Sequence, residues 1–344
     1  PGEGQEPLRT SCLWAGAPYE SIFWLCSAVN PPPLLVSYQD VEQLLQAMPS
    51  ELALRYGAES AAMAERGLPP AVSVRIIALL FGYSGKFVGS LSTAPRKHYR
   101  TFLIPKGRRR RTIRAPRVAL KLIQRWIGFH LERSIAWPGH VTGFVTGRSH
   151  LTAVKAHTDA QWVYSVDIEN FFPSVSRARV RYVLESLGYS SHASETISSL
   201  VCFDDALAQG SPSSPTLANL AMRDLDSKLL EITRLNGYRY TRYADDLVFS
   251  GLHESPSEEI RAQIKAEIEA DGWRLASEKE YFAVRPKRLK VHGILVDSLV
   301  PRLTRGYRNK LRAYRHMLQN ASLSDVDRKR LQGHVDYADS VDRY

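Results

Sequence analysis

The stretch TRYADDLVFS, residues 241–250, constrains the fold of this chain more than any other segment. It places two adjacent acids, Asp245 and Asp246, between two runs of residues that favour buried strands. Those runs are Tyr238, Tyr240 and Thr241 before the pair, and Leu247, Val248 and Phe249 after it. The pattern predicts strand, short turn, strand, with both aspartates at the tip of a hairpin.

A third acid ends another apolar run, in the segment QWVYSVDIENFFPSV. Residues 162–168 read as a central strand, with Asp167 near its end. A carboxylate there is unfavourable unless it is hydrogen-bonded, paired or bound to a metal. The ordinary alternative is that Asp167 caps the turn at Asn170, and Asp245 and Asp246 allow the same interpretation because Asp is a common turn residue.

The three acids together favour a metal site over three separate turns. If the Asp167 strand lies beside the hairpin, carboxylates converge and repel one another, and divalent cations relieve that repulsion. Oxygen ligands with room for water suit Mg²⁺, and two such ions about 4 Å apart support in-line phosphoryl transfer. We expect Asp167 and Asp245 to bridge two Mg²⁺ ions and Asp246 to point differently, because successive strand residues face opposite ways.

Charge and cysteine content set the cellular context. Lys and Arg number 46 against 35 Asp and Glu, a net charge of +11 that favours a polyanionic partner. The three cysteines, Cys12, Cys26 and Cys202, form no CxxC pair and predict neither disulfides nor a zinc site. No apolar run approaches the roughly 20 residues of a membrane span. We therefore expect a soluble, cytoplasmic protein with no membrane partner.

The rest of the chain reads as helices around one basic hairpin. Helical spacing covers residues 38–66, 72–81 and 118–132, and a polar turn is expected after residue 81. The segment YRTFLIPKGRRRRTIRAP predicts a hairpin whose tip carries Arg108 to Arg111. After Asp297 a basic helix is expected to grip a duplex backbone, and a last helix is expected to begin near Ser324.

A further block, AQGSPSSPTLANLAMRDL, joins a turn to a helix start. Gln209 and Gly210 form the turn, Ser211 to Ser214 are small, and Pro215 suits the first helical turn. Small residues at such a place let a nucleic-acid backbone or base approach closely. An ordinary loop and helix start is the alternative for this block on its own.

The blocks in this order resemble the palm of a reverse transcriptase, of the bacterial retron and group II-intron-like branch. The resemblance covers residues 99–297 and includes RTIRAP before LKLIQRWI, GFVTGRSHLTAVKAH, SEK and KVHGILVD. It implies a mixed α/β (α+β) right-hand polymerase fold. The expected parts are an N-terminal helical lobe at 1–95, fingers and palm at 96–298, and a short helical thumb at 299–344, with no room for further intron-type domains.

The resemblance also implies roles for single residues. Asp167, Asp245 and Asp246 match the catalytic metal triad, with Ile168 as an additional metal position. Phe172 matches the gate that excludes a 2′-hydroxyl, and Gln209 the pocket for nucleotide and template. Arg111 and Arg114 match positions that hold a triphosphate, and Lys279 a lysine near the departing pyrophosphate that acts as general acid. The remaining expectations are RNA contacts, at His157, Arg305, Arg308 and Arg312.

Two stretches depart from the retron pattern. Retron enzymes typically carry an Asn-Ala-x-x-His block and a Val-Thr-Gly block. This chain has Ala153-Val154-Lys155-Ala156-His157 and Val291-His292-Gly293 in their places. The departures bear on the retron assignment and leave the polymerase assignment intact.

The function implied is an RNA-directed DNA polymerase that uses dNTPs and copies a dedicated structured non-coding RNA into cDNA. In this family that product is the RNA-linked DNA of a retron (msDNA), made in antiphage defence with a possible effector protein. Two alternatives remain open: a defence-associated reverse transcriptase outside the retrons, with another template or priming mode, and a catalytically idle RNA-binding scaffold. An RNA-templated RNA polymerase fits less well, because Phe172 favours deoxynucleotides.

Overall fold

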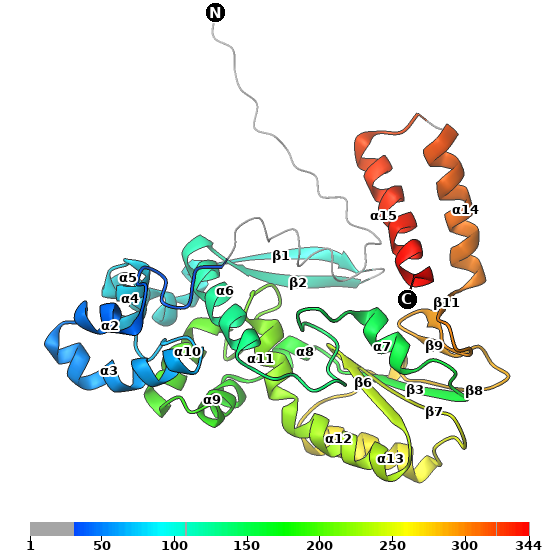
Figure 1. Ribbon diagram of the computed structural model, residues 1–344, viewed down its shortest axis with the longest axis horizontal. Coiled ribbons are helices and arrows are strands. Elements are labelled where there is room, and N and C mark those ends of the chain that lie inside the picture. The colour runs from blue at the N-terminus through cyan, green and yellow to red at the C-terminus, as the bar shows by residue number, and fades with distance from the viewer. Residues whose placement is uncertain (1–30, 107–108, 321, 344) are drawn as a thin grey trace, which may run out of the picture.

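The computed structural model describes residues 31–106, 109–320 and 322–343. Arg108 at the tip of the expected basic hairpin, and Cys12 and Cys26, lie outside these ranges. Cys202 is buried and is a free thiol. Figure 1 shows N-terminal helices at one end, a β-hairpin above a four-stranded sheet, and two C-terminal helices that project from the other end.

Four helices build the N-terminal end: α2 (Val41–Gln46), α3 (Ser50–Glu65), α4 (Val74–Phe81) and α5 (Gly85–Thr93). The helix expected over 38–66 exists but divides into α2 and α3 just before Ser50. The polar turn expected after residue 81 exists at residues 82–84 but is shorter than expected, because α5 follows it. Ser84 caps α5 by accepting a hydrogen bond from the backbone N–H of Phe87, and Val88 and Leu91 bury its apolar side.

The basic hairpin is confirmed as β1 (Tyr99–Lys106) and β2 (Arg109–Pro116), paired antiparallel from Tyr99 opposite Pro116. A short 3₁₀ turn, η1 (Pro95–His98), leads into it, and α6 (Val118–Arg133) follows. Leu120, Ile123, Trp126 and Ile127 bury one side of α6 in the core. The spacing of these residues is what made α6 predictable.

The central sheet has the strand order β6-β7-β3-β8, with every neighbouring pair antiparallel. Its strands are β6 (Arg239–Tyr243), β7 (Asp246–Gly251), β3 (Trp162–Asp167) and β8 (Tyr281–Val284). The predicted strand, turn and strand around the paired acids is therefore confirmed. Because β3 is next to β7, the end of the Asp167 strand meets the hairpin, as expected from the sequence.

Further helices and short strands cover the sheet or connect it to the N-terminal helices. They are α7 (His150–Ala156), α8 (Phe171–Ser174), α9 (Arg177–Ser186), α10 (Ser191–Val201), β4 (Cys202–Phe203), β5 (Ala206–Leu207), α11 (Ser214–Ala221), α12 (Arg223–Leu235), α13 (Glu258–Ala270) and η2 (Ser277–Lys279). One hydrophobic core runs from Leu35 to Trp273 and joins the N-terminal helices to the sheet. The division at residue 95 thus stays a prediction, since residues 31–95 share their core with later segments.

The C-terminal part begins with three short strands in the order β11-β10-β9: β9 (Lys290–Val291), β10 (Ile294–Leu295) and β11 (Arg302–Leu303). The helices α14 (Arg305–Asn320) and α15 (Asp325–Asp342) follow, and Ser324 caps α15 as predicted. A second hydrophobic cluster packs this part on the sheet and α7, with Leu311 from α14 and Val335 from α15 among its members. Figure 1 shows the two helices side by side, as a thumb requires. None of the helices in the described ranges is long and apolar enough to cross a bilayer.

Candidate active site

The hairpin between β6 and β7 carries the paired acids at one end of the sheet. Ala244 and Asp245 form its turn, and Ala244 has a positive φ of 57°. Asp246 begins β7 directly opposite Asp167, the last residue of β3. Directly opposed residues point to the same face of a sheet, so Asp246 and Asp167 share a face. That Asp246 points differently from Asp245, its neighbour in sequence, stays a prediction. The backbone N–H of Ile168 donates to the carbonyl oxygen of Asp245 at 2.9 Å and ties the two chain ends together.

Asp167 is a largely buried acid that contacts a lysine. Its side chain is 16% exposed, and the Nζ of Lys279 contacts its Oδ1. Burial, and then the negative charge of Asp245, raise the pKa of Asp167 to about 6 in spite of Lys279. A carboxylate that is buried beside other carboxylates is stabilised by a bound cation.

The donor set fits Mg²⁺ in chemistry, since it offers only carboxylate and carbonyl oxygens. Among the residues that the structure describes, no three acid, His or Cys side chains already converge on one point. Lys279 contacts Asp167, and Nδ1 of His292 lies 3.0 Å from Oδ2 of Asp246. The Ile168 side chain is buried and apolar, so only its backbone carbonyl oxygen suits a metal.

A cavity of about 460 Å³ lies at this end of the sheet, and of the three acids Asp245 lines it. It brings together seven residues that the sequence singled out: Arg111, Arg114, Ile168, Phe172, Gln209, Asp245 and Lys279. The two arginines lie on β2. The other five residues come from later segments of the chain, between the end of β3 and η2. The cavity therefore joins cationic side chains, an acid and an aromatic wall, a composition that suits a nucleoside triphosphate.

The turn at Gln209 and Gly210 packs directly on strand β2. The backbone N–H of Arg114 donates to the carbonyl oxygen of Gln209 at 2.8 Å. Gly210 has a φ of 119°, and a Cβ on it would lie 2.9 Å from the Ile113 side chain. Glycine is thus required here for close approach. The Arg114 guanidinium lies 4.6 Å from the centre of the Phe203 ring and 3.6 Å from a carboxylate oxygen of Asp204.

Phe172 forms an aromatic wall with a residue to which sequence reasoning gave no role. Its ring centre lies 5.9 Å from that of Phe144 and 5.4 Å from that of Phe171, and Phe172 is 6% exposed. Phe144 has a left-handed φ of 59° and lines the same cavity. The available signal was its place in the block GFVTG.

The serines of QGSPSSP do not face the cavity, contrary to the expectation that they admit a base or backbone. Ser211, Ser213 and Ser214 are buried. Ser211 donates to Oε1 of Gln124 on α6 at 2.7 Å. A Cβ on Gly128 of α6 would lie 3.0 Å from the Cα of Ser213. Small residues are needed here because helix α6 packs tightly on the loop.

The expectation that His157 contacts RNA is also wrong. His157 is fully buried, and its two ring nitrogens lie 2.7 Å from the hydroxyls of Ser250 and Thr241. Burial lowers its pKa to about 3, so the ring is neutral. Its bonds join α7 to strands β6 and β7 and leave no polar atom for a ligand.

A buried polar network behind the catalytic hairpin was missed by sequence reasoning. The Arg242 guanidinium donates from Nε and Nη2 to the two carboxylate oxygens of Asp226, and from Nη1 to Oδ1 of Asn219 at 2.8 Å. Nη1 also lies 3.3 Å from the carbonyl oxygen of Ala244 in the turn. A Cβ on Gly143 would lie 2.4 Å from the backbone nitrogen of Ala244, so glycine is required there as well. The only sequence signal was an arginine inside an otherwise strand-like run.

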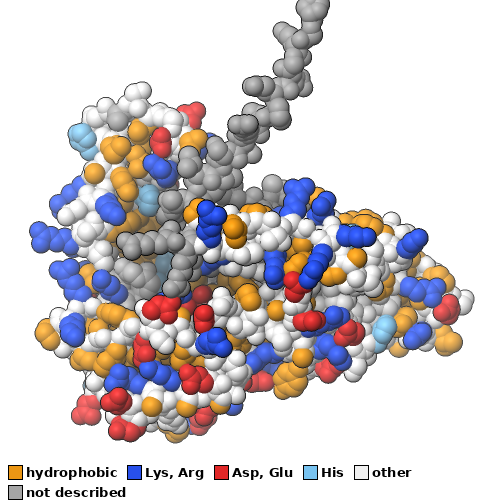
Figure 2. All heavy atoms as spheres, turned by 180° about the vertical axis from the view of Figure 1, so that it is seen from behind, with side chains coloured by type: hydrophobic (Ala, Val, Ile, Leu, Met, Phe, Trp, Pro, Cys, Tyr) orange, Lys and Arg blue, Asp and Glu red, His pale blue; other side chains and the backbone are white. Residues whose placement is uncertain are grey.

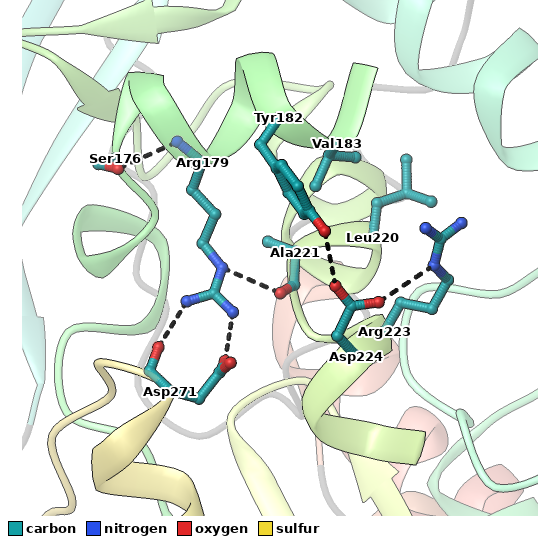
Figure 3. A pocket seen from close by; sticks show the side chains of 9 residues that line it. All are labelled: Ser176, Arg179, Tyr182, Val183, Leu220, Ala221, Arg223, Asp224 and Asp271. Atoms are coloured by element: carbon teal, nitrogen blue, oxygen red, sulfur yellow. Dashed lines mark hydrogen bonds and ion pairs between the residues drawn. The ribbon is translucent and has the colours of Figure 1, made fainter. Parts of the chain in front are cut away.

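A second cavity, of about 430 Å³, lies between α9, α12 and the end of α13 (Figure 3). Its charged side chains pair with one another: Arg179 with Asp271, and Arg223 with Asp224. Arg179 also donates to the carbonyl oxygen of Ala221 at 3.1 Å. None of the predicted site residues lines this cavity.

The predicted RNA-binding arginines of the C-terminal part lie outside the cavity, on α14. Arg305, Arg308 and Arg312 are exposed and lie on one stripe of the helix, at spacings of three and four residues. None of them forms an ion pair with another residue in the described ranges. Figure 2 shows Lys and Arg side chains along the edge of the molecule that carries the C-terminal helices.

Residues 104–296, more than half of the chain, match the family described as reverse transcriptase (RNA-dependent DNA polymerase). The retron Mx65 reverse transcriptase of Myxococcus xanthus is 33% identical over 301 residues, which cover 81% of this chain and 69% of that protein. The retron Ec86 reverse transcriptase of Escherichia coli is 30% identical over 247 residues, which cover 71% of this chain and 77% of that protein. A third relative, the retron Mx162 enzyme of Myxococcus xanthus, is 33% identical over 253 residues and is covered to 52%.

Among solved structures, telomerase from Candida albicans is similar to this chain, with a TM-score of 0.42 and 10% identity over 64% of this chain and 50% of that one. A foamy viral protease-reverse transcriptase has a TM-score of 0.41 and 16% identity over 70% of this chain and 36% of that one.

Proposed function

This chain belongs to the reverse transcriptase family, among its retron members, and we propose that it copies a dedicated structured RNA into RNA-linked DNA (msDNA) by two-metal phosphoryl transfer. The observation that carries the proposal is the cavity lined by Asp245, at the end of the sheet where Asp167 and Asp246 face each other. It places two arginines of β2 opposite the end of the sheet that holds the acids. Fingers and palm thus enclose one nucleotide-sized site.

Asp167, Asp245 and Asp246 are the residues that would hold two Mg²⁺ ions, with the carbonyl oxygen of Ile168 as an additional ligand. Bound Mg²⁺ activates the 3′-hydroxyl of the primer and stabilises the leaving pyrophosphate. The negative charge of Asp167 is disfavoured without a cation, because burial and Asp245 oppose its ionisation. The protein therefore keeps part of its binding site in a state that a divalent ion stabilises.

The nucleotide is held by residues from both sides of the cavity. Arg111 and Arg114 are placed to bind triphosphate oxygens in bidentate fashion. Gln209 lines the cavity and would contact the incoming base and the template. The hydrogen bond from the backbone N–H of Arg114 to the carbonyl oxygen of Gln209 holds it against β2. Phe172, braced by Phe144, stands where a ribose 2′-hydroxyl would clash, which favours dNTPs.

Lys279 has a different resting role from the one expected of a general acid. Burial disfavours its charge, but the hydrogen bond to Asp167 and the charge of Asp167 outweigh burial and raise its pKa. It neutralises Asp167 before a metal arrives. To protonate the departing pyrophosphate, Lys279 must break its contact with Asp167. A metal bound at the Asp167 carboxylate would weaken that contact, because it would compensate the same negative charge.

The stripe of Arg305, Arg308 and Arg312 would bind the phosphate backbone of the structured RNA. Exposed arginines without an acidic partner release counterions when they meet phosphate, which gives affinity without base specificity. The division into an N-terminal lobe to residue 95, fingers and palm to 298, and a thumb from 299 is part of the same proposal. An effector protein is a further expected partner, in keeping with a role in antiphage defence.

The test is to purify the protein from its native host and to sequence the nucleic acid that comes with it. Wild type is compared with Asp245→Ala/Asp246→Ala, which removes two metal ligands. We expect a discrete RNA joined to complementary DNA in the wild type, and the RNA alone in the variant. RNA without DNA in both samples would refute msDNA synthesis and favour an RNA-binding scaffold.

The matched control is Glu258→Ala/Glu259→Ala, which removes two adjacent exposed acids at the start of α13. This variant should yield the same RNA-linked DNA as the wild type. Loss of DNA in both double variants would show that the readout follows net charge or expression level, and the metal assignment would lose its support. Proteins that co-purify with the wild type and carry no polymerase motifs are the candidates for the effector.

A further inference from the structure

His292 occupies a tight turn beside the catalytic acids, at the place where the Val-Thr-Gly block departs from the retron pattern. The turn joins β9 to β10, and Val291 pairs directly with Ile294 across it. His292 and Gly293 both have left-handed backbones, with φ values of 48° and 82°. Two positive φ angles in a two-residue connection are the signature of a type I′ turn. A β-branched threonine is strained in that conformation, whereas His, Asn and Gly are tolerated.

The turn directs the imidazole of His292 at a catalytic acid. Nδ1 lies 3.0 Å from Oδ2 of Asp246, and the His292 side chain is only 9% exposed. The ring also packs against Tyr243, with ring centres 5.3 Å apart. A fixed backbone turn and an aromatic neighbour therefore restrict where the ring can go.

The surroundings decide which ring nitrogen carries the hydrogen. Nε2 of His292 is buried and has no hydrogen-bond partner among the described residues. An N–H buried without an acceptor is more costly than a bare lone pair in the same place. The hydrogen is therefore assigned to Nδ1, where it faces the Asp246 carboxylate. The contact needs no charge on the ring.

We propose that His292 is a positioning residue that fixes the carboxylate of Asp246 for metal binding. Asp246 is 34% exposed at the first position of β7, so its side chain has rotational freedom that the Nδ1 contact removes. With Oδ2 engaged by His292, Oδ1 is the oxygen that would be left to bind a metal. The inference rests on the proposed role of Asp246 as a metal ligand and adds the residue that orients it.

The left-handed backbone of residue 292 limits which substitutions can be made there without strain. His292→Gly removes the side chain and keeps the left-handed conformation without strain. His292→Asn keeps that conformation and places an amide N–H close to the position of Nδ1. The control is His192→Asn on α10, where the ring stacks on Tyr56 of α3 with ring centres 5.6 Å apart and does not line the cavity beside the acids.

The primary measurement is the affinity for Mn²⁺ alone, by electron paramagnetic resonance titration of each full-length protein without nucleic acid. We expect His292→Gly to bind Mn²⁺ about tenfold more weakly than wild type, at the lower end of the range for residues that orient metal ligands. His292→Asn should stay within about threefold of wild type, since it restores the donor. His192→Asn should match wild type.

Thermal unfolding without metal shows whether each variant folds, so a loss of affinity is read only from folded protein. Equal Mn²⁺ affinity of wild type and His292→Gly would overturn the proposal. An equal loss in the Gly and Asn variants would also overturn it, because the donor would then not matter. A folded wild type that binds no Mn²⁺ would refute metal binding by the three acids and this inference with it. DNA synthesis should follow the affinities, with kcat lowered and KM for dNTP unchanged.

Discussion

The carboxylate of Asp226 and the guanidinium of Arg242 form a fully buried ion pair directly behind the catalytic hairpin. Nε of Arg242 lies 2.8 Å from Oδ1 of Asp226, and Nη2 lies 2.7 Å from Oδ2. The Arg242 side chain is 0% exposed and the Asp226 side chain 3%. Tyr240 donates its hydroxyl to the same carboxylate at 2.7 Å. Because Arg242 lies on β6, three residues before Asp245, the pair fixes the strand that leads into the turn with the acids.

Removal of one partner should therefore destabilise the protein strongly. We expect Arg242→Met to lower the free energy of unfolding by about 3–5 kcal/mol, because Asp226 is left buried and unpaired. The double variant Arg242→Met/Asp226→Leu should recover much of that loss, since it leaves no buried charge. Urea unfolding measures both. Polymerase activity should stay low in the double variant, because the bonds to Asn219 and Ala244 are gone.

An exposed pair on α12 supplies the control for this experiment. Arg234 and Glu231 lie 3.2 Å apart, with side chains 69% and 61% exposed. Arg234→Met should leave the unfolding curve unchanged, as is usual for surface ion pairs. Full activity in the restabilised double variant would contradict a positioning role for Arg242 and leave it a role in stability alone.

Asp167 should make the metal-free protein less stable at neutral pH. Its pKa is about 6 in the folded state against 3.8 for the ordinary carboxyl group. Between these values the folded protein binds more protons than the unfolded chain, so stability falls as pH rises from about 4 to about 6 and stays lowered above that. Asp167→Asn should therefore be more stable than wild type at pH 7.5 by about 3 kcal/mol, and inactive.

Urea unfolding in EDTA at several pH values measures this difference. The gain of the Asn variant should shrink towards zero near pH 4, where Asp167 is protonated in the folded state. Asp336→Asn, at an exposed position of α15, serves as the control and should parallel wild type. A constant difference between Asp167→Asn and wild type across the pH range would show that ionisation of Asp167 is not its cause. Saturating Mg²⁺ should stabilise wild type and not Asp167→Asn.

Phe172 should control the choice between dNTPs and ribonucleotides. Phe172→Val shortens the wall beside Phe144 and opens space for a 2′-hydroxyl. We expect the ratio of kcat/KM for ribonucleotide to that for dNTP to rise at least tenfold, by primer extension with single nucleotides. The milder Val substitution limits the cavity left in a site that is 6% exposed.

The control for discrimination is Phe282→Val on β8, a half-buried phenylalanine that does not line the cavity. It should lose stability without a change in the nucleotide ratio. If both variants discriminate like wild type, Phe172 is a core residue and not the gate.

The arginine stripe on α14 should dominate the salt dependence of RNA binding. Replacement of Arg305, Arg308 and Arg312 by Ala removes three exposed charges. The slope of log Kd against log salt concentration should fall by roughly 2–3, with each lost phosphate contact contributing about 0.7–0.9. Fluorescence anisotropy with a structured RNA between 50 and 300 mM salt measures the slope.

A charge-matched control replaces Arg75, Arg181 and Arg234 by Ala. These three lie on α4, α9 and α12, and each pairs with a glutamate. This variant should keep the wild-type slope. The same decrease in both triple variants would mean that net charge attracts the RNA and that α14 has no special part in the contact.

Much of the local structure was predictable because its causes lie within a few residues. Helix α6 follows from the spacing of Leu120, Ile123 and Ile127, and α15 begins where Ser324 caps it. The hairpin with Asp245 and Asp246 follows from strand-like runs on both sides of a turn. Helix α5 was missed because glycines and serines, which have weak helix propensity, are frequent in its sequence. The helix forms because the rest of the protein buries Val88 and Leu91.

The sequence by itself determined that Asp245, Phe172 and two arginines of β2 lie together, since their types and order along the chain carry the family pattern. Only the tertiary structure decided the partners of buried polar groups. His157 bonds to Ser250, 93 residues away, and Arg242 to Asp226, 16 residues away. His292 meets Asp246 only because two separate turns end at the same place. The sequence of a polar residue is the same whether its side chain is exposed or buried. Burial makes a hydrogen-bond partner necessary, and distant parts of the chain decide which side chains are buried.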